Sequence, residues 1–245
     1  IGKTLSVDEL VEKQGYEAVY IASGAGLPNF MHIKGEGSNG VFSANELLTR
    51  NNLMKAHSDE YKTPVTVGKK AVIVGAGNVA MDAARTAKRN GAKVTIIYRK
   101  GMENMTASKK EITEAKEDGV EFLLYHAPLE ITDDGILLKH QEEKISEEIF
   151  FPADSIIVAI SQNPRANIVS NTTELKTNQA GLLLTDERGN TTKEGTFASG
   201  DVVTGAKTVV EAVHQAKIVA EEMEAYCEAK KNMKEITKTA AESAS

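Results

Sequence analysis

A glycine-rich turn between a short apolar strand and a helix constrains this chain more than any other feature. Residues 75–80 read Gly-Ala-Gly-Asn-Val-Ala; a strand is predicted before them, over 70–74, and a helix after them, from about Val79 to Asn90. Gly91 stands where a glycine commonly ends a helix. A GxGxxA turn is a weak signal by itself, but it is informative when it opens a helix inside a β-α-β unit.

The positions of this turn have separable roles in binding a dinucleotide. Gly75 permits the tight bend, Gly77 lets a pyrophosphate approach the backbone, and Ala80 keeps the helix close to the sheet. The amides near Asn78 and Val79 would then face the phosphates at the positive end of the helix dipole. The alternative, a glycine-rich turn with a structural role that binds no ligand, stays open at this point.

The end of the second strand bears on the choice between NAD and NADP. Sites for NAD usually place an acidic residue there, whereas sites for NADP use arginine for the 2′-phosphate. Here Arg99 and Lys100 follow Tyr98, and no acid occurs before Glu103. A planar guanidinium binds a phosphate through two parallel hydrogen bonds. We therefore predict NADP(H) rather than NAD(H), with a solvated basic turn as the alternative.

The segments that follow extend the unit into an α/β fold. Strands are expected over 94–98 and 120–125, with a helix between them that Ser108 caps and that ends near Asp118. The β-α-β-α-β order implies a parallel sheet with right-handed crossovers. Later segments are short and broken, and we expect antiparallel strands over 128–132, 135–141 and 145–151, then a buried strand over 155–160.

Capping patterns predict three further helices in the flanking segments. Ser6 opens a helix to about Lys13, Ser43 opens one toward Ala56, and Thr208 opens one to about Glu228. Short strands are expected over 18–22 and 196–199. Polar segments at 57–69 and 162–164 are the expected crossings between domains.

Composition narrows the classes of function. The net charge of −6 argues against a nucleic-acid surface, and no apolar run is long enough to span a bilayer, so cytoplasmic residence is the default. Cys227 is the sole cysteine, which excludes an internal disulfide and an iron–sulfur cluster held by this chain alone. The scattered histidines show no metal-ligand spacing, so no metal site is expected. The start at Ile1 hints at a fragment.

Several motifs together resemble the glutamate synthase small (beta) subunit and its relatives. The relatives include the large subunit of ferredoxin:NADP transhydrogenase, sulfide dehydrogenase and, more distantly, dihydropyrimidine dehydrogenase. The resemblance covers roughly residues 1–226, and the matching stretches are 16–25, 75–85, 98–100, 199–201 and 208–212. Small departures from the family pattern are Ser23 in place of threonine, Ser161 in place of glycine and Thr106 in place of proline.

The resemblance implies a fold of the pyridine nucleotide-disulfide oxidoreductase type, with a Rossmann-like NAD(P)-binding domain inserted into a partial FAD-binding domain. The implied division is 1–64 for the first FAD part with its connector, 65–162 for the NADP(H) domain, 163–228 for the return to the FAD domain, and 229–245 for a flexible tail. Such proteins begin with a cysteine-rich iron–sulfur domain and a first dinucleotide motif, and this sequence has neither. We therefore expect the C-terminal part of a longer flavoprotein.

The resemblance also assigns residues to FAD. Asp201, after Gly200, would bond the ribityl or phosphate region, and the amides that open the helix at Thr208 and Val209 would face the pyrimidine edge of the flavin. Gly24 lies in the turn after the first strand of that domain. Because the first dinucleotide motif is absent, we expect the FAD site in this chain to be incomplete.

The expected function is passage of hydride from NADPH to FAD, and then of electrons to iron–sulfur clusters, for glutamate formation with a large partner subunit. No acid or base is expected to act as a catalytic residue, because the cofactors carry the chemistry. Two alternatives stay open: the same fold in a transhydrogenase, with ferredoxin as partner, or in a sulfide dehydrogenase; and an isolated nucleotide-binding module without catalysis. A homodimer is also open.

Overall fold

The chain folds into two compact units. The computed structural model describes residues 4–58, 60–63, 65–141 and 147–243. Residues 28–161 form one unit, which we call the inserted unit, and residues 1–27 together with 162–245 form the terminal unit. The inserted unit interrupts the terminal unit in sequence, so the chain passes from one to the other twice. The short strands β2 (Leu27–Pro28) and β11 (Gln162–Asn163), which pair with each other, lie at these passages.

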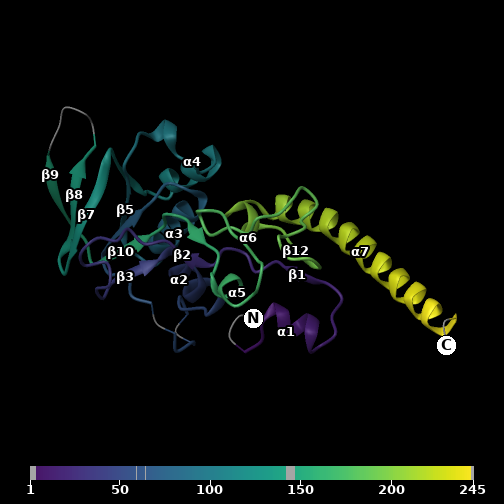
Figure 1. The fold of residues 1–245 in the computed structure, drawn as a ribbon. Coiled ribbons are helices and arrows are strands. Elements are labelled where there is room, and N and C mark those ends of the chain that lie inside the picture. Colours follow the sequence, from purple (N-terminus) through teal and green to yellow (C-terminus); the bar gives the residue numbers. More distant parts are fainter. Residues whose placement is uncertain (1–3, 59, 64, 142–146, 244–245) are drawn as a thin grey trace. The chain divides into compact units, whose positions relative to one another are not determined.

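A parallel sheet of five strands forms the centre of the inserted unit (Figure 1). The sheet order is β3 (Val41–Ser43), β10 (Ser155–Val158), β4 (Lys70–Val74), β5 (Lys93–Tyr98) and β6 (Glu121–Leu124). Every neighbouring pair is parallel, and Val74 at the end of β4 pairs with Ile97 near the end of β5. The predicted parallel β-α-β-α-β arrangement is confirmed in β4, β5 and β6.

Helices pack on one face of this sheet. Helix α3 (Asn78–Arg89) presents a stripe of small buried residues, and α4 (Lys109–Glu117) lies beside it. The alanines of α3 pack with Ile73, Val94 and Ile96 in one hydrophobic cluster, because small side chains let a helix approach a sheet closely. Helix α2 (Ala44–Leu48) joins the same cluster through Leu47.

Three antiparallel strands cover the other face. They are β7 (His126–Thr132), β8 (Gly135–His140) and β9 (Glu148–Pro152). Their apolar side chains pack with Val72, Val74 and Ile97 of the parallel sheet in a second cluster. Side chains of alternate β4 residues therefore pack on opposite faces of the sheet, as the two-residue period of a strand requires. The antiparallel prediction is confirmed, although the first residues of the expected strand 145–151 lie outside the described part of the chain.

The terminal unit has a smaller core around two parallel strands, β1 (Val19–Ile21) and β12 (Thr196–Ala198). Helix α1 (Val7–Glu12) begins with the predicted capping box between Ser6 and Glu9. The other helices are α5 (Asn167–Ser170), α6 (Asp201–Thr204) and α7 (Val209–Ser243), the long yellow helix of Figure 1.

The first domain crossing differs from the sequence-based expectation. It was expected within 57–69, so residues 28–64 were assigned to the FAD part, but the structure divides the chain between residues 27 and 28. The reason is non-local pairing: β3 adds to the sheet beside β10, with Val41 opposite Ile156. A strand of three residues carries almost no periodicity, so its partner far along the chain decides its place.

Two helices also differ in length from their predictions. The helix capped by Ser43 was expected to run toward Ala56, but α2 ends at Leu48 and a π-helical turn, η1 (Thr49–Leu53), continues from it. A short 3-10 turn, η2 (Met102–Asn104), also follows β5. Helix α7 was expected to end near Glu228 before a flexible tail, yet it continues to Ser243. Its last part is rich in alanine, lysine and glutamate and contains no glycine or proline, so nothing in the sequence stops the helix.

Candidate dinucleotide site

The turn after β4 requires glycine at its first position for reasons internal to the chain. Gly75 has a φ of +139°. A β-carbon built on Gly75 would lie 2.2 Å from the carbonyl oxygen of Ala159, which follows β10. Backbone atoms cannot yield as a flexible side chain can, so any larger residue would force the two strand ends apart.

The second glycine of the turn is different. Gly77 has a φ of −92° and a ψ of 176°, an extended conformation that any residue adopts. A β-carbon on Gly77 would meet only the Oγ1 of Thr106, at an ordinary contact distance of 3.5 Å. Neither the backbone nor the packing within the described chain therefore demands glycine here. The position is half-buried with only this one described neighbour, which suits a ligand that must come close to the backbone.

Helix α3 begins at this point with unpaired donors. Gly77 is its N-cap, and its carbonyl accepts the amides of Ala80 and Met81. Among the described residues, no acceptor bonds the amides of Asn78 or Val79, and both residues are exposed. Free amides at the positive end of a helix are a favourable place for an anion.

The loop after β5 is tied onto the turn. The amide of Ala107 donates to the carbonyl of Ala76 over 3.0 Å, and the amide of Ser108 donates to Oδ1 of Asn78 over 2.8 Å. The side chain of Asn78 thus anchors the residue that caps α4, while its backbone amide stays free. The sequence predicted the amide's role but not the anchor.

Arg99 and Lys100 lie at the end of β5, next to the strand that leads into the turn. Both are exposed, and no described residue forms an ion pair with either. The hydroxyl of Tyr98 donates to the carbonyl of Asn104 over 2.9 Å and fixes the chain just after them. Carboxyl ends of neighbouring parallel strands meet at one edge of a sheet, so the turn and the two cations share that edge.

A charged network joins α3 to α4 and was not predicted. Arg85 donates to Asp118 over 2.8 Å and to Glu114 over 2.5 Å, with Glu111 at 3.4 Å. The hydrogen bond from Arg85 holds the pKa of Asp118 below its ordinary value. Burial, assisted by Glu111, raises the pKa of Asp82 on the same helix. The spacing within α3 could have shown that Arg85 lies beside its buried stripe, but not which acids it meets.

The residues assigned to FAD lie in the terminal unit, where parallel strands β1 and β12 end. Gly24 and Gly200 both have positive φ angles, +66° and +74°. The amide of Gly200 donates to Oε1 of Gln215 over 3.0 Å, and the hydroxyls of Tyr20 and Ser199 are 2.5 Å apart. These bonds fix the turn that carries Gly200, and none was predicted.

Asp201 and Thr208 prepare the start of α7. Oδ1 of Asp201 accepts the amide of Lys207 over 3.1 Å, and Thr208 forms reciprocal bonds with Glu211 that complete the predicted capping box. The hydrogen bonds from Thr208 also lower the pKa of Glu211. Val209 and Val210 are each 78% exposed, and no described residue accepts their amides, so the first turn of α7 presents two unpaired donors beside apolar side chains.

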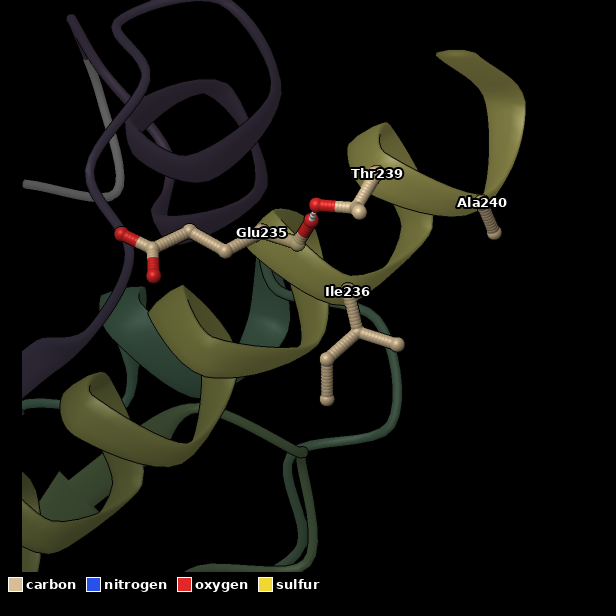
Figure 2. Close-up of a pocket in the computed structure, with 4 residues that line it drawn as sticks. All are labelled: Glu235, Ile236, Thr239 and Ala240. Atoms are coloured by element: carbon tan, nitrogen blue, oxygen red, sulfur yellow. Dashed lines mark hydrogen bonds between the residues drawn. The ribbon is translucent and has the colours of Figure 1, made fainter. Parts of the chain in front are cut away.

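A hollow on α7 carries no functional argument. Figure 2 shows it on the last turns of the helix, with Glu235, Ile236, Thr239 and Ala240 around it. It is lined by one helix alone and holds no convergent polar groups. Within the described ranges, no cluster of three potential metal ligands is present, and no helix is long and apolar enough to cross a bilayer.

Comparison with known proteins identifies the family. Residues 2–216 match the pyridine nucleotide-disulphide oxidoreductase family. The chain belongs to this family. Membership implies an oxidoreductase that binds flavin and a nicotinamide nucleotide, and it confirms the predicted fold class.

Curated relatives share this stretch of sequence. The chain is 32% identical to the glutamate synthase [NADPH] small chain of Azospirillum brasilense over 94% of its own length and 52% of the relative's. It is 33% identical to the NAD-dependent dihydropyrimidine dehydrogenase subunit PreT of Escherichia coli over 93% of its own length and 51% of the relative's. The chain therefore spans about half the length of these relatives.

Solved structures share the fold. The thioredoxin reductase of T. acidophilum has a TM-score of 0.69 at 20% identity, covering 86% of this chain and 66% of that one. The thioredoxin reductase of Lactococcus lactis has a TM-score of 0.67 at 24% identity, with 85% and 65% covered. At these identities the likeness is one of fold alone. A single cysteine cannot form the redox pair of a disulfide reductase within this chain.

Proposed function

We propose that the inserted unit binds NADPH and that the protein passes its reducing equivalents to FAD, as in a glutamate synthase small subunit. The terminal unit is then the second part of the FAD-binding domain, and the inserted unit is the NADPH domain. The observation that carries the proposal is Gly77, a glycine that the chain itself does not need, placed before free amides at the start of α3.

The residues present fit a dinucleotide. A pyrophosphate would accept from the amides of Asn78 and Val79, and the missing β-carbon at Gly77 would let it approach. Arg99 and Lys100, exposed and unpaired among the described residues, would bind the 2′-phosphate that distinguishes NADPH from NADH. The relatives include both an NADPH-named and an NAD-named protein, so the titration below uses both dinucleotides.

The terminal unit fits part of an FAD site. Gly24 and Gly200 offer uncovered backbone at the ends of β1 and β12, and Thr208 and Val209 open a long helix with exposed amides. Oδ1 of Asp201 accepts the amide of Lys207, and no donor among the described residues bonds Oδ2, which would accept from a ribityl hydroxyl. Because this stretch lacks a second dinucleotide motif, we expect it to retain FAD weakly.

Hydride transfer from a nicotinamide to a flavin is chemistry that the cofactors supply. We assign no catalytic residue to this chain, whose part is to bind and orient the dinucleotide. The acceptor beyond the flavin would be iron–sulfur clusters and then a large partner subunit that forms glutamate. The dihydropyrimidine dehydrogenase subunit among the relatives favours a second candidate, in which the same electron input serves another acceptor.

Titration of the chain with NADPH and with NADH tests the proposal. We expect NADPH to bind more tightly, and Arg99→Ala to weaken NADPH about tenfold while changing NADH little, because only NADPH carries the extra phosphate. Arg165→Ala, which removes an exposed arginine of the terminal unit, is the matched control and should change neither. Failure of both dinucleotides to bind would contradict the proposal.

A further inference from the structure

Gly101, Glu103 and Tyr125, which lie beside Arg99 and Lys100, form an arrangement that the dinucleotide motif does not explain. Gly101 follows Lys100 directly and is buried, with a φ of −77° that any residue adopts. A β-carbon on Gly101 would lie 2.3 Å from Oε1 of Glu103, 2.4 Å from its Oε2 and 2.3 Å from the hydroxyl of Tyr125. A carboxylate and a phenol therefore occupy the space that the absent side chain leaves.

The backbone of Tyr125, whose hydroxyl is one of these groups, is strained. Its φ is +57°, a left-handed conformation that bulky residues rarely adopt. The strain is held on both sides: the amide of Tyr125 donates to the carbonyl of Lys100 over 3.4 Å, and its carbonyl accepts from Gln141 over 2.8 Å. Strain of this kind costs about 1–3 kcal/mol and is concentrated at binding and switch positions.

Glu103 brings a negative charge to the edge where the cations lie. It is exposed, and no described residue forms an ion pair with it, so neither Arg99 nor Lys100 neutralises its charge. A carboxylate repels a phosphate dianion, whereas it accepts a hydrogen bond from a ribose hydroxyl. The two cations therefore favour NADPH, which carries the 2′-phosphate, whereas the carboxylate favours NADH, which has a free 2′-hydroxyl.

We propose that Glu103 is a specificity-determining residue that lowers the preference for NADPH over NADH. The inference rests on the proposed function, because it assumes that the dinucleotide lies at the edge formed by the ends of β4 and β5. Both carboxylate oxygens of Glu103 lie within 2.4 Å of the place where a β-carbon on Gly101 would stand, so the charge of Glu103 lies directly beside Lys100. The chain would then accept both dinucleotides, with a preference smaller than Arg99 and Lys100 alone would give.

The test compares dissociation constants for NADPH and NADH in Glu103→Gln and in Glu117→Gln. Glu117, exposed at the end of α4, gives the same change in net charge away from the turn. We expect Glu103→Gln to tighten NADPH about threefold to tenfold, to leave NADH unchanged or weaker, and to lose most of this effect at high salt. Glu117→Gln should leave the ratio of the two constants unchanged.

Two results would overturn the inference, and they are distinguishable from failure of the proposed function. A ratio that stays the same in Glu103→Gln, while wild type binds NADPH, rules out Glu103 and leaves the NADPH site intact. A ratio that shifts equally in Glu117→Gln shows a general charge effect. Absence of binding by wild type to either dinucleotide contradicts the proposed function itself.

Discussion

The two glycines of the turn after β4 are glycine for different physical reasons, although the motif writes them alike. Gly75 is required by its positive φ and by the carbonyl of Ala159, both of which belong to the protein. Gly77 is required by neither, so its lack of a side chain matters only to something that approaches from outside. The motif alone does not separate these causes, because both positions are written as glycine.

Alanine at each glycine should separate stability from binding. Gly75→Ala should lower the free energy of unfolding by about 3 kcal/mol, since strain and a clash with backbone both oppose it. Gly77→Ala should change that free energy by no more than about 0.5 kcal/mol and yet weaken NADPH at least tenfold. Urea unfolding and NADPH titration of the two variants measure these effects. Equal destabilisation by both changes would remove the distinction.

Ser161 departs from the family pattern at a position where the backbone conformation favours glycine. Glycine is usual there, and Ser161 has a φ of +82°. Ser161→Gly should raise the free energy of unfolding by up to about 1 kcal/mol, because relief of left-handed strain outweighs the added freedom of the unfolded chain. Ser161→Ala keeps the β-carbon and should not stabilise. Thermal unfolding of both variants decides, and stabilisation by alanine would assign the effect to the hydroxyl.

At the scale of elements, sequence signals succeeded where they are local. Capping residues at Ser6, Ser108 and Thr208 begin the predicted helices, and apolar runs give the parallel strands. The sequence-based prediction differs from the structure at three places: the placement of β3, the π-helical end of α2 and the length of α7. A distant strand partner determines the place of β3, and no stop signal marks the end of α7. Whether a helix continues past its packed part depends on the absence of breaking residues, which a search for start signals does not weigh.

The ion network between α3 and α4 makes a pH prediction at this scale. Arg85 lowers the pKa of Asp118, so the ionised form is favoured in the folded state. Its stabilising contribution is present above the ordinary pKa near 3.8 and is lost as pH falls through the lower folded value. Asp118→Asn should therefore be less stable than wild type at pH 7 and equal to it in strong acid.

Thermal melts across pH 2–7 would measure this difference, with Glu117→Gln as the control. Glu117 is the neighbouring acid and has no ion pair among the described residues, so its change should leave the pH profile as in wild type. A deficit of Asp118→Asn that stays constant down to pH 2 would show that the network contributes through packing and not through charge.

At the scale of the whole molecule, the fold class and the inserted arrangement could be predicted, whereas the first boundary could not. The Gly-rich turn, the two cations that follow β5 and the second crossing near residue 162 are all local in sequence. The boundary between residues 27 and 28 depends on a three-residue strand and its non-local partner. The proximity of Glu103 and Tyr125 at Gly101, and the positive φ of Tyr125, are not predictable from the sequence, because they join residues from two separate loops.

Binding of NADPH through the free backbone donors at the start of α3 underlies every functional proposal made for this chain. An NMR titration of the isotope-labelled chain with NADPH tests it directly, because amide shifts report contacts at single residues. We expect the largest shifts at the amides of Gly77, Asn78 and Val79, with further shifts at Arg99 and Lys100. Saturating NADPH that leaves these amides unmoved, or that moves only residues of the terminal unit, would contradict it.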